Sequence, residues 1–364
     1  MRIKVFFASF FIFIVAILFG GWATTDTSLN PFSHSTDQTL YDMEDLPTAE
    51  AIILKLNHTL EVPRYDVGLF GNSRSEMVGR KELGHDECKF FNFSASGESI
   101  RNSLGMLEYL AALGKAPRLA IISFDHMEIE GMIGNPESLP LDAKLKFAFR
   151  DLTFVATNKL SLKDNFRLAA RYARMTWKSM TTAVSSRWLL EGARRLQDWD
   201  WGKKPIQLST VSGFRTDGSF VYGREPSVTS PSFKPTPYDQ KISALLKNDL
   251  VRLKALEGKG RYGVEKIVIY ESPLAPPFDR LYANAPQSLT ASKRKEYLNA
   301  CQTLGLTCLN PPPGSIEPDK NVWRDATHPP AIGLAKYIWR LIKDSEICDA
   351  MTEGTDKFER RPAL

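Results

Sequence analysis

The sequence predicts an α/β fold, in which a parallel sheet is covered by helices. Two observations lead to this prediction. Strands and helices alternate along much of the chain, which is typical of a parallel sheet. Residues 119–122 and 267–269 are continuous apolar runs, as expected for parallel strands that are buried on both faces. Hydrophobic residues make up 43% of the chain and charged residues 24%, so a globular core is expected rather than wholesale disorder.

The alternating pattern occurs in two blocks. Residues 65–130 form the first half of the predicted core, with strands at 65–70, 89–93 and 118–124 and a helix at 98–113. Residues 237–348 form the second half, with helices at 238–256, 289–304 and 331–347 and strands at 264–270 and 306–309. Apolar residues recur every three or four positions in the helices, which places them on one face. Residues 349–364 form a polar tail.

A mainly helical insertion, residues 131–236, separates the two halves. Its last part, 209–237, is a loop rich in Ser, Pro and Gly. In the helical part of the insertion, four basic residues share one helical face: Arg167, Arg171, Arg174 and Lys178. This face is either solvated or a surface that meets anionic glycan or lipid headgroups.

The N-terminus predicts export. Arg2 and Lys4 precede an apolar, charge-free run over residues 5–23, which fits a signal anchor through the membrane or a cleaved signal peptide. Residues 24–64 then form a polar tether and a short helix at 48–60. The chain is therefore expected to be anchored in the cytoplasmic membrane with a periplasmic or extracellular domain, or to be secreted if the signal is cleaved.

Export places the four cysteines in an oxidising compartment. A disulfide between Cys301 and Cys308 is the preferred pairing, while Cys88 and Cys348 remain. Buried free thiols are the alternative, and the spacings do not resemble a zinc site. The net charge of +5 is too small to indicate nucleic-acid binding, and no nucleic-acid motif occurs.

A serine directly follows the first predicted strand, in Gly71-Asn72-Ser73-Arg74-Ser75. At a strand-to-helix turn its hydroxyl is presented at the sheet edge, and the amides of the next turn point at an anion. Gly71 permits the tight turn. The same pattern also fits an ordinary helix N-cap.

Two further motifs follow predicted strands or precede a helix. Gly97 comes after the second strand, where its N–H has room to approach a ligand, although a simple turn would also use glycine. Asp325 and His328 lie three residues apart before the last helix. There the imidazole would accept a serine proton and the carboxylate would fix its tautomer. A surface histidine without such a role is the alternative.

Together and in this order, the three motifs resemble the SGNH/GDSL hydrolase family. Gly71-Asn72-Ser73-Arg74-Ser75 is similar to the family's first block, Gly-Asp-Ser-x-Ser, with asparagine in place of aspartate. Gly97 is similar to the glycine of the second block, and Asp325-Ala326-Thr327-His328 matches the fifth block, Asp-x-x-His. The resemblance covers about residues 65–125 and 264–347. It implies an SGNH-like three-layer α/β/α sandwich, a triad of Ser73, His328 and Asp325, and an oxyanion hole made by the N–H groups of Ser73 and Gly97.

The third block departs from the family. Where the family has Gly-x-Asn-Asp, this chain has Ser123-Phe124-Asp125-His126. An ionised carboxylate only accepts hydrogen bonds, so Asp125 cannot stabilise an oxyanion, and losing such a donor typically costs about 10²–10³-fold in rate. Either Arg74, His126 or Ser272 substitutes as donor, or Asp125 binds a sugar hydroxyl, or the protein is a poor catalyst.

The N-terminal anchor and helical insertion make the chain more similar to exported branches of the family. These include the alginate O-acetyltransferases and the teichoic-acid D-alanylation protein. The resemblance implies a serine esterase or O-acyltransferase that acts on acyl esters, such as those of a cell-envelope polysaccharide. It implies no metal and no organic cofactor, and it allows a membrane acyl-transfer protein as partner. The alternative is a non-catalytic glycan-binding or assembly component on the same fold.

Overall fold

The computed structural model divides the chain into two compact units. One contains Met1–Val62 and Pro136–Thr216, and the other contains Pro63–Asn135 and Asp217–Leu364. The structure describes residues 32, 40–41, 48–84, 88–125, 128, 139–158, 166, 169–170, 172–174, 177, 208–209, 213–222, 244–258, 263–276, 278–279, 289–312, 314–317, 323–325 and 327–348.

The second unit contains a parallel five-stranded sheet, as the sequence predicted. Its strand order is β3-β2-β4-β8-β9, and every neighbouring pair is parallel. The strands are β2 (Val67–Phe70), β3 (Phe90–Asn92), β4 (Leu119–Phe124), β8 (Lys266–Glu271) and β9 (Thr307–Leu309). Numbered along the chain this order is 2-1-3-4-5, so the order reverses between β2 and β4. In open α/β sheets, ligands bind beyond the carboxyl ends of the strands at such a switch point.

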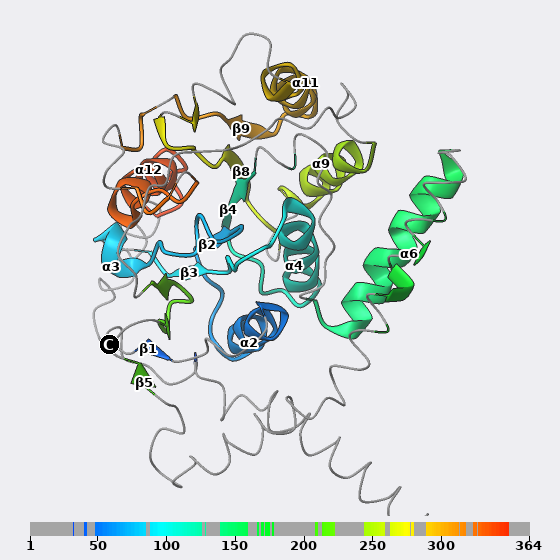
Figure 1. The fold of residues 1–364 in the computed structure, drawn as a ribbon. Helices are drawn as coiled ribbons and strands as arrows, with labels where there is room; N and C mark the ends of the chain where they lie inside the picture. Colours follow the sequence, from blue (N-terminus) through cyan, green and yellow to red (C-terminus); the bar gives the residue numbers. More distant parts are fainter. Residues whose placement is uncertain are drawn as a thin grey trace, which may run out of the picture. The chain divides into compact units, whose positions relative to one another are not determined.

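Helices lie on both faces of this sheet (Figure 1). One face carries α3 (Arg80–Leu83) and α12 (Ala331–Lys343), which contact each other. The other carries α4 (Ile100–Ala112) and α9 (Ala244–Leu256), and α11 (Leu289–Leu304) contacts α9 and β9. The central strands are consequently buried on both sides, which explains their continuous apolar sequence.

Alternate residues of each central strand enter different cores. Val67 and Leu69 of β2 belong to one hydrophobic cluster with Leu334 and Ile338 of α12. Phe70, the neighbour of Leu69, is fully buried but lies outside that cluster and stacks on Phe93 with ring centroids 4.6 Å apart. The sheet therefore lies between two apolar layers, and packing on both of its faces fixes the position of its carboxyl edge.

Bidentate ion pairs fix the helices of the second unit. Arg252 of α9 donates from Nε and Nη2 to the two carboxylate oxygens of Glu108 on α4, at 3.0 and 2.7 Å. Arg294 of α11 makes the same kind of fork with Glu271 at the end of β8, at 2.6 and 2.5 Å. Because a planar guanidinium matches a carboxylate in only one orientation, these pairs fix geometry as well as contributing energy.

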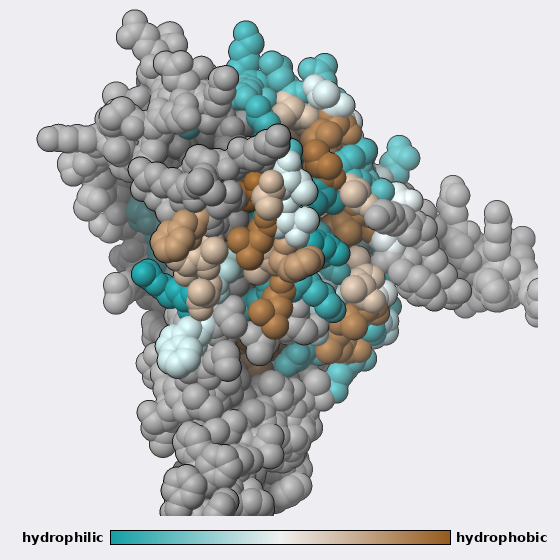
Figure 2. Space-filling view, turned by 90° about the vertical axis from the view of Figure 1, so that its right-hand side faces the viewer, coloured by the Kyte–Doolittle hydropathy of each residue, from teal (hydrophilic) through white to brown (hydrophobic). Residues whose placement is uncertain are grey.

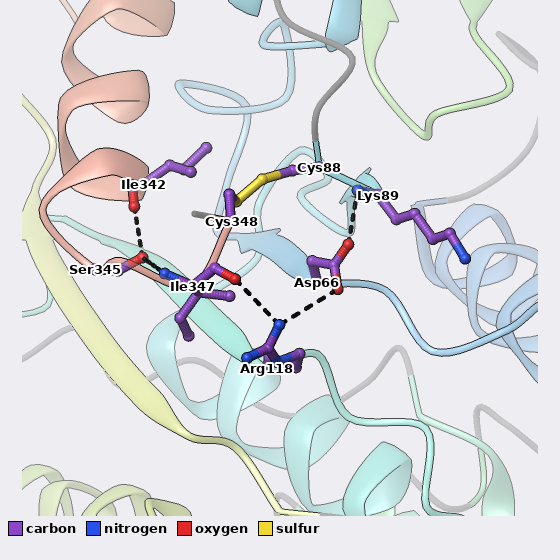
Figure 3. Close-up of a disulfide and its surroundings, with 8 residues drawn as sticks. All are labelled: Asp66, Cys88, Lys89, Arg118, Ile342, Ser345, Ile347 and Cys348. Atoms are coloured by element: carbon purple, nitrogen blue, oxygen red, sulfur yellow. Dashed lines mark hydrogen bonds and ion pairs between the residues drawn. A yellow bond between two sulfur atoms is a disulfide. The ribbon is translucent and has the colours of Figure 1, made fainter. Parts of the chain in front are cut away.

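Two disulfides close the second unit. Cys301 and Cys308 are joined, as preferred from the sequence, and so are Cys88 and Cys348. Figure 3 shows that the second bond links the approach to β3 with the chain just after α12, where Arg118 Nη1 donates to the carbonyl of Ile347 at 3.1 Å. The free-thiol alternative is therefore wrong.

The first unit contains α2 (Thr48–Glu61) and α6 (Leu141–Thr157). Strands β1 (Leu40–Tyr41), β5 (Leu208–Ser209) and β6 (Gly213–Phe214) pair antiparallel, with β1 between the other two. The ring of Phe214 meets Phe32 edge-on, with centroids 5.9 Å apart, and the buried ammonium of Lys55 lies 4.7 Å from its centroid. Two large apolar side chains of α6, Leu145 and Phe149, are exposed. The face of the molecule seen in Figure 2 mixes hydrophobic and hydrophilic side chains.

Most predicted elements occur within a few residues of their expected bounds, but two expectations need correction. The last helix ends at Lys343 instead of residue 347, because the chain then turns through Glu346, whose φ is +59°, and brings Cys348 to Cys88. Residues 217–222, assigned to the insertion, belong with the core unit.

Several expectations fall on parts of the chain outside the described residues. These are the signal segment 1–23, the tail 349–364, and Arg167, Arg171 and Lys178 of the basic face; Arg174 of that face is exposed. Among the helices that are described, none has the length and apolar character needed to cross a membrane.

The two disulfides should differ in their contribution to stability. Because a cross-link restricts the unfolded chain more when it closes a longer loop, replacing Cys88 and Cys348 together with serine should lower the free energy of unfolding by about 5 kcal/mol. The Cys301→Ser/Cys308→Ser variant, whose cysteines are separated by 7 positions rather than 260, should lose about 2–3 kcal/mol. Urea unfolding of both variants measures this, and a larger loss for the second variant would contradict the prediction.

Candidate functional site

Ser73 lies in a tight turn at the carboxyl end of β2, at the switch point of the sheet. The side-chain oxygen of Asn72 accepts the N–H of Arg74 at 3.0 Å, and the carbonyl of Asn72 accepts the N–H of Ser75 at 3.1 Å. Such side-chain and main-chain hydrogen bonds form a local turn without the inter-strand hydrogen bonds of a sheet. Ser73 is part-exposed while both of its neighbours are buried, so the hydroxyl is presented from a fixed backbone.

Asn92, at the end of β3, holds this turn in place. Its side-chain nitrogen lies 2.9, 3.2 and 2.8 Å from the carbonyl oxygens of Ser75, Glu76 and Val78. Its side-chain oxygen accepts the N–H of Ser94 at 2.8 Å. Asn92 is fully buried, where unpaired polar groups are costly, so its amide specifies the path of the chain after Ser73. The sequence around Asn92 gave no indication of this role.

Asp325 and His328 form a compact loop before α12. One carboxylate oxygen of Asp325 accepts the backbone N–H groups of Thr327 and His328, at 2.7 and 3.0 Å, and the hydroxyl of Thr327 at 2.9 Å. The other oxygen lies 2.7 Å from Nδ1 of His328. The carboxylate therefore fixes both the loop and the imidazole ring.

Trp323 anchors the same loop. Its side chain is 1% exposed and packs with Leu274, Ala275 and Phe278, which follow β8. Its Nε1 donates to the carbonyl of Glu317 at 3.1 Å. The Asp325–His328 loop is thus tied to the carboxyl end of β8, on the same edge of the sheet as Ser73.

The hydrogen bonds around Asp325 keep its carboxyl group ionised. Burial alone would raise the pKa of Asp325, but the hydrogen bonds from His328 and Thr327 and the charge interaction with His328 lower it more, so that the net pKa is well below its usual range. An ionised carboxylate can only accept, so Nδ1 of His328 carries a hydrogen. In the neutral imidazole, Nε2 is then the acceptor.

The two ends of the core meet at this point. Nε2 of His328 lies 2.8 Å from Oγ of Ser73, although the residues are 255 positions apart. Ser73, His328 and Asp325 consequently form a continuous hydrogen-bonded chain of hydroxyl, imidazole and carboxylate. This is the geometry in which a base withdraws the proton of a nucleophile and a third group orients the base.

The two backbone N–H groups of the predicted oxyanion hole, those of Ser73 and Gly97, have no acceptor among the described residues. Gly97 has φ of +76° in a turn closed by the N–H of Glu98 and the carbonyl of Ala95, at 3.2 Å. Both groups are therefore available to an external oxygen.

Two of the three remaining candidate donors, Arg74 and Ser272, are used within the protein. Asp125 Oδ2 accepts from Asn72 Nδ2 at 3.1 Å and lies 3.1 Å from Nη2 of the buried Arg74. Ser272 is buried, with its hydroxyl 2.5 Å from that of Ser123. His126 lies outside the described residues. Asp125 and Arg74 thus neutralise each other and brace the turn that carries Ser73.

Tyr222 is a residue of the site that the sequence did not indicate. Its hydroxyl lies 3.5 Å from the carbonyl oxygen of Ser73 and 3.2 Å from Oε2 of the buried Glu76. Burial, followed by the charge of Glu76, raises the pKa of Tyr222, so the phenol stays protonated. The preceding strand segment docks on the core, since the N–H of Phe220 donates to the carbonyl of Glu76 at 2.8 Å. A loop rich in Ser, Pro and Gly gives no periodic signal that would have predicted this contact.

Comparisons with known proteins add no family assignment. No family model matches the chain, and no curated protein or solved structure is significantly similar to it. In the described part of the chain, no three His, Cys, Asp or Glu side chains are grouped so that they could hold a metal ion.

Gly71 should be irreplaceable in the turn before Ser73. Its φ is +148°, and an added Cβ would lie 2.4 Å from Ser123 Cβ and 2.7 Å from Ser75 Oγ. Gly71→Ala should therefore lower the free energy of unfolding by about 3 kcal/mol or more, because overpacking adds to backbone strain. Gly84→Ala is the matched control, since Gly84 has φ of +71° with open space around it and should lose only about 1 kcal/mol. Equal losses in urea unfolding would contradict the steric explanation.

Glu128 should make stability depend on pH. Its part-buried carboxyl accepts the N–H of Ile100, in the first turn of α4, at 2.8 Å and the N–H of Asp125 at 3.2 Å. Burial outweighs these bonds and, with the charges of Asp125 and Asp249, raises the pKa of Glu128 to about 8. As pH rises from about 4.5 to about 8, the unfolded chain loses a proton that the folded chain keeps, so stability falls.

Glu128→Gln should remove this contribution and flatten the stability profile over that range. Urea unfolding at several pH values measures the slope. The same change at the exposed Glu346 serves as control and should leave the wild-type slope. An unchanged slope in Glu128→Gln would show that Glu128 does not titrate in this way.

Proposed function

We propose that this chain is a serine esterase or O-acyltransferase with an SGNH-like fold, in which Ser73 is the nucleophile, His328 the base and Asp325 the residue that orients the base. The observation that carries the proposal is the pair of contacts at His328, 2.8 Å to Ser73 Oγ and 2.7 Å to Asp325 Oδ2. The strand order, with Ser73 after the first strand of the sheet and the Asp-x-x-His loop before the last helix, agrees with the proposed fold.

In the proposed reaction Ser73 Oγ attacks the carbonyl carbon of an ester while its proton passes to Nε2 of His328. The open N–H groups of Ser73 and Gly97 stabilise the negative oxygen of the tetrahedral intermediate. The bond to the alcohol then breaks, and the leaving alcohol takes the proton from Nε2. Water, or the hydroxyl of an acceptor such as a sugar, attacks the acyl-enzyme by the same route in reverse.

Asp125 favours a second candidate function. Its carboxylate stands where the family has an asparagine donor, and it is bound to Arg74 and Asn72 rather than open to a substrate oxygen. With two backbone donors and no side-chain donor, the oxyanion would be stabilised less than in a site that has the family's asparagine donor. The second candidate is therefore a glycan-binding or assembly component that uses the same site without turnover.

Covalent labelling distinguishes the two. A fluorophosphonate should modify the exported domain at Ser73, as located by peptide mass spectrometry, because the probe reports an activated serine. Ser73→Ala should abolish labelling and lower the hydrolysis of 4-nitrophenyl acetate by at least about 10³-fold. His328→Ala should lose labelling as well, since the serine would no longer have a base.

Ser315→Ala is the matched control, because Ser315 is an exposed serine of the same unit; its labelling and activity should equal those of the wild type. A folded wild-type domain that neither labels nor hydrolyses the ester, with Ser73→Ala indistinguishable from it, would support the non-catalytic candidate instead.

A further inference from the structure

The guanidinium of Arg324 lies beside the triad without taking part in it. Its Cζ is 3.4 Å from the ring centroid of Tyr222, and the Tyr222 hydroxyl lies 3.5 Å from the carbonyl oxygen of Ser73. Arg324 also directly precedes Asp325, and its backbone N–H donates to the carbonyl of His328 at 3.2 Å. A positive charge is thus held one aromatic ring away from the main chain of the nucleophile.

The geometry leaves the hydrogen-bonding edge of this guanidinium usable. When an arginine stacks on an aromatic face, its N–H groups point sideways in the stacking plane, where they can meet a planar anion. Arg324 is part-exposed, and no described carboxylate lies within ion-pair distance of it. This differs from Arg74, Arg252 and Arg294, which are each committed to an acidic side chain.

The segment that carries Tyr222, on whose ring Arg324 lies, is anchored by hydrogen bonds and close packing. Asp217 Oδ1 accepts the N–H and the hydroxyl of Ser219 at 3.0 and 2.7 Å, and Asp217 Oδ2 accepts the N–H of Arg80 at 2.6 Å. Gly218 packs so closely that an added Cβ would lie 2.2 Å from the carbonyl oxygen of Asn92. The segment that supplies Tyr222 is therefore anchored on the core unit, and the guanidinium is positioned before any ligand arrives.

We infer that Arg324, stacked on Tyr222, is a specificity-determining residue that binds an anionic group, a carboxylate or a phosphate, on the substrate next to its ester. The inference rests on the proposed esterase or acyltransferase function and names the substrate class for that site. Arg324 supplies charge and bidentate hydrogen bonds to the anion, Tyr222 fixes its orientation, and the triad acts on the neighbouring ester.

Three acetyl esters of one sugar test the inference. They are O-acetylated methyl glucoside, which is neutral, O-acetylated methyl glucuronide, which carries a carboxylate, and O-acetylated methyl glucoside 6-phosphate. The wild type should have the higher kcat/KM for an anionic ester, through a lower KM, and the two anionic arms tell carboxylate from phosphate. Arg324→Ala should lower the ratio of anionic to neutral kcat/KM by about 10- to 100-fold, as expected for loss of hydrogen bonds to a charged group.

Three variants separate positioning from general electrostatics. Arg324→Lys keeps the positive charge but not the paired N–H donors of the guanidinium, so the ratio of anionic to neutral kcat/KM should fall to an intermediate value. Tyr222→Leu keeps the arginine but removes its platform, and it should also lower the ratio. Lys336→Ala removes one positive charge from an exposed position on α12, and its ratio should equal the wild-type value.

Binding without turnover keeps this test separate from that of the proposed function. Methyl glucuronide and methyl glucoside 6-phosphate, which carry no ester, are titrated calorimetrically into the wild type and Arg324→Ala. Weaker binding of one anion by the variant supports the inference even if no ester is cleaved. The inference is overturned if the wild type labels at Ser73 but shows no preference for anionic esters. It is also overturned if Arg324→Ala keeps the wild-type kcat/KM ratio and affinity. Neither result contradicts the proposed role of the triad.

Discussion

The contact between Ser73 Oγ and His328 Nε2 is the constraint on which the rest of the site depends. It joins residues 255 positions apart, and a side-chain hydrogen bond by itself contributes only about 1 kcal/mol. Such a bond cannot assemble the site, so the surrounding structure has to place both groups beforehand. Each is placed from a different strand end on the same edge of the sheet, Ser73 from β2 and His328 through the loop anchored after β8.

Buried polar groups provide that placement. The amide of Asn92 binds the carbonyls of the Ser73 turn, and Asp125 binds the side chains on either side of Ser73. On the other part of the site, Asp325 uses one oxygen for the loop and the other for the imidazole. Because an unsatisfied polar group in a buried site is costly, such networks specify one arrangement when every member is bonded. The departure at Asp125 is consistent with this, since its carboxylate is a brace for the turn rather than a donor to substrate.

The segment 217–222 shows how an insertion can contribute to a core site. It follows a long stretch that belongs to the first unit, yet it bonds to the ends of β3 and of the Ser73 turn and supplies Tyr222. Tyr222 separates two opposite charges near Ser73. Glu76 lies behind the Tyr222 hydroxyl, and Arg324 lies over the Tyr222 ring. Tyr222 therefore contacts the Glu76 carboxylate through its hydroxyl and the Arg324 guanidinium through its ring.

The sequence by itself determined the sheet and the three motifs. Apolar runs such as 119–122 and the helical spacing of 98–113 depend on local periodicity, and Ser73, Gly97 and the Asp325–His328 pair stand at the ends of those elements, where such sheets place ligands. It did not determine the Cys88–Cys348 pairing, the roles of Asn92 and Asp125, or the approach of Tyr222 and Arg324 to Ser73. These depend on contacts between residues far apart in the chain, whose partners leave no periodic trace in the sequence, so only the tertiary structure decided them.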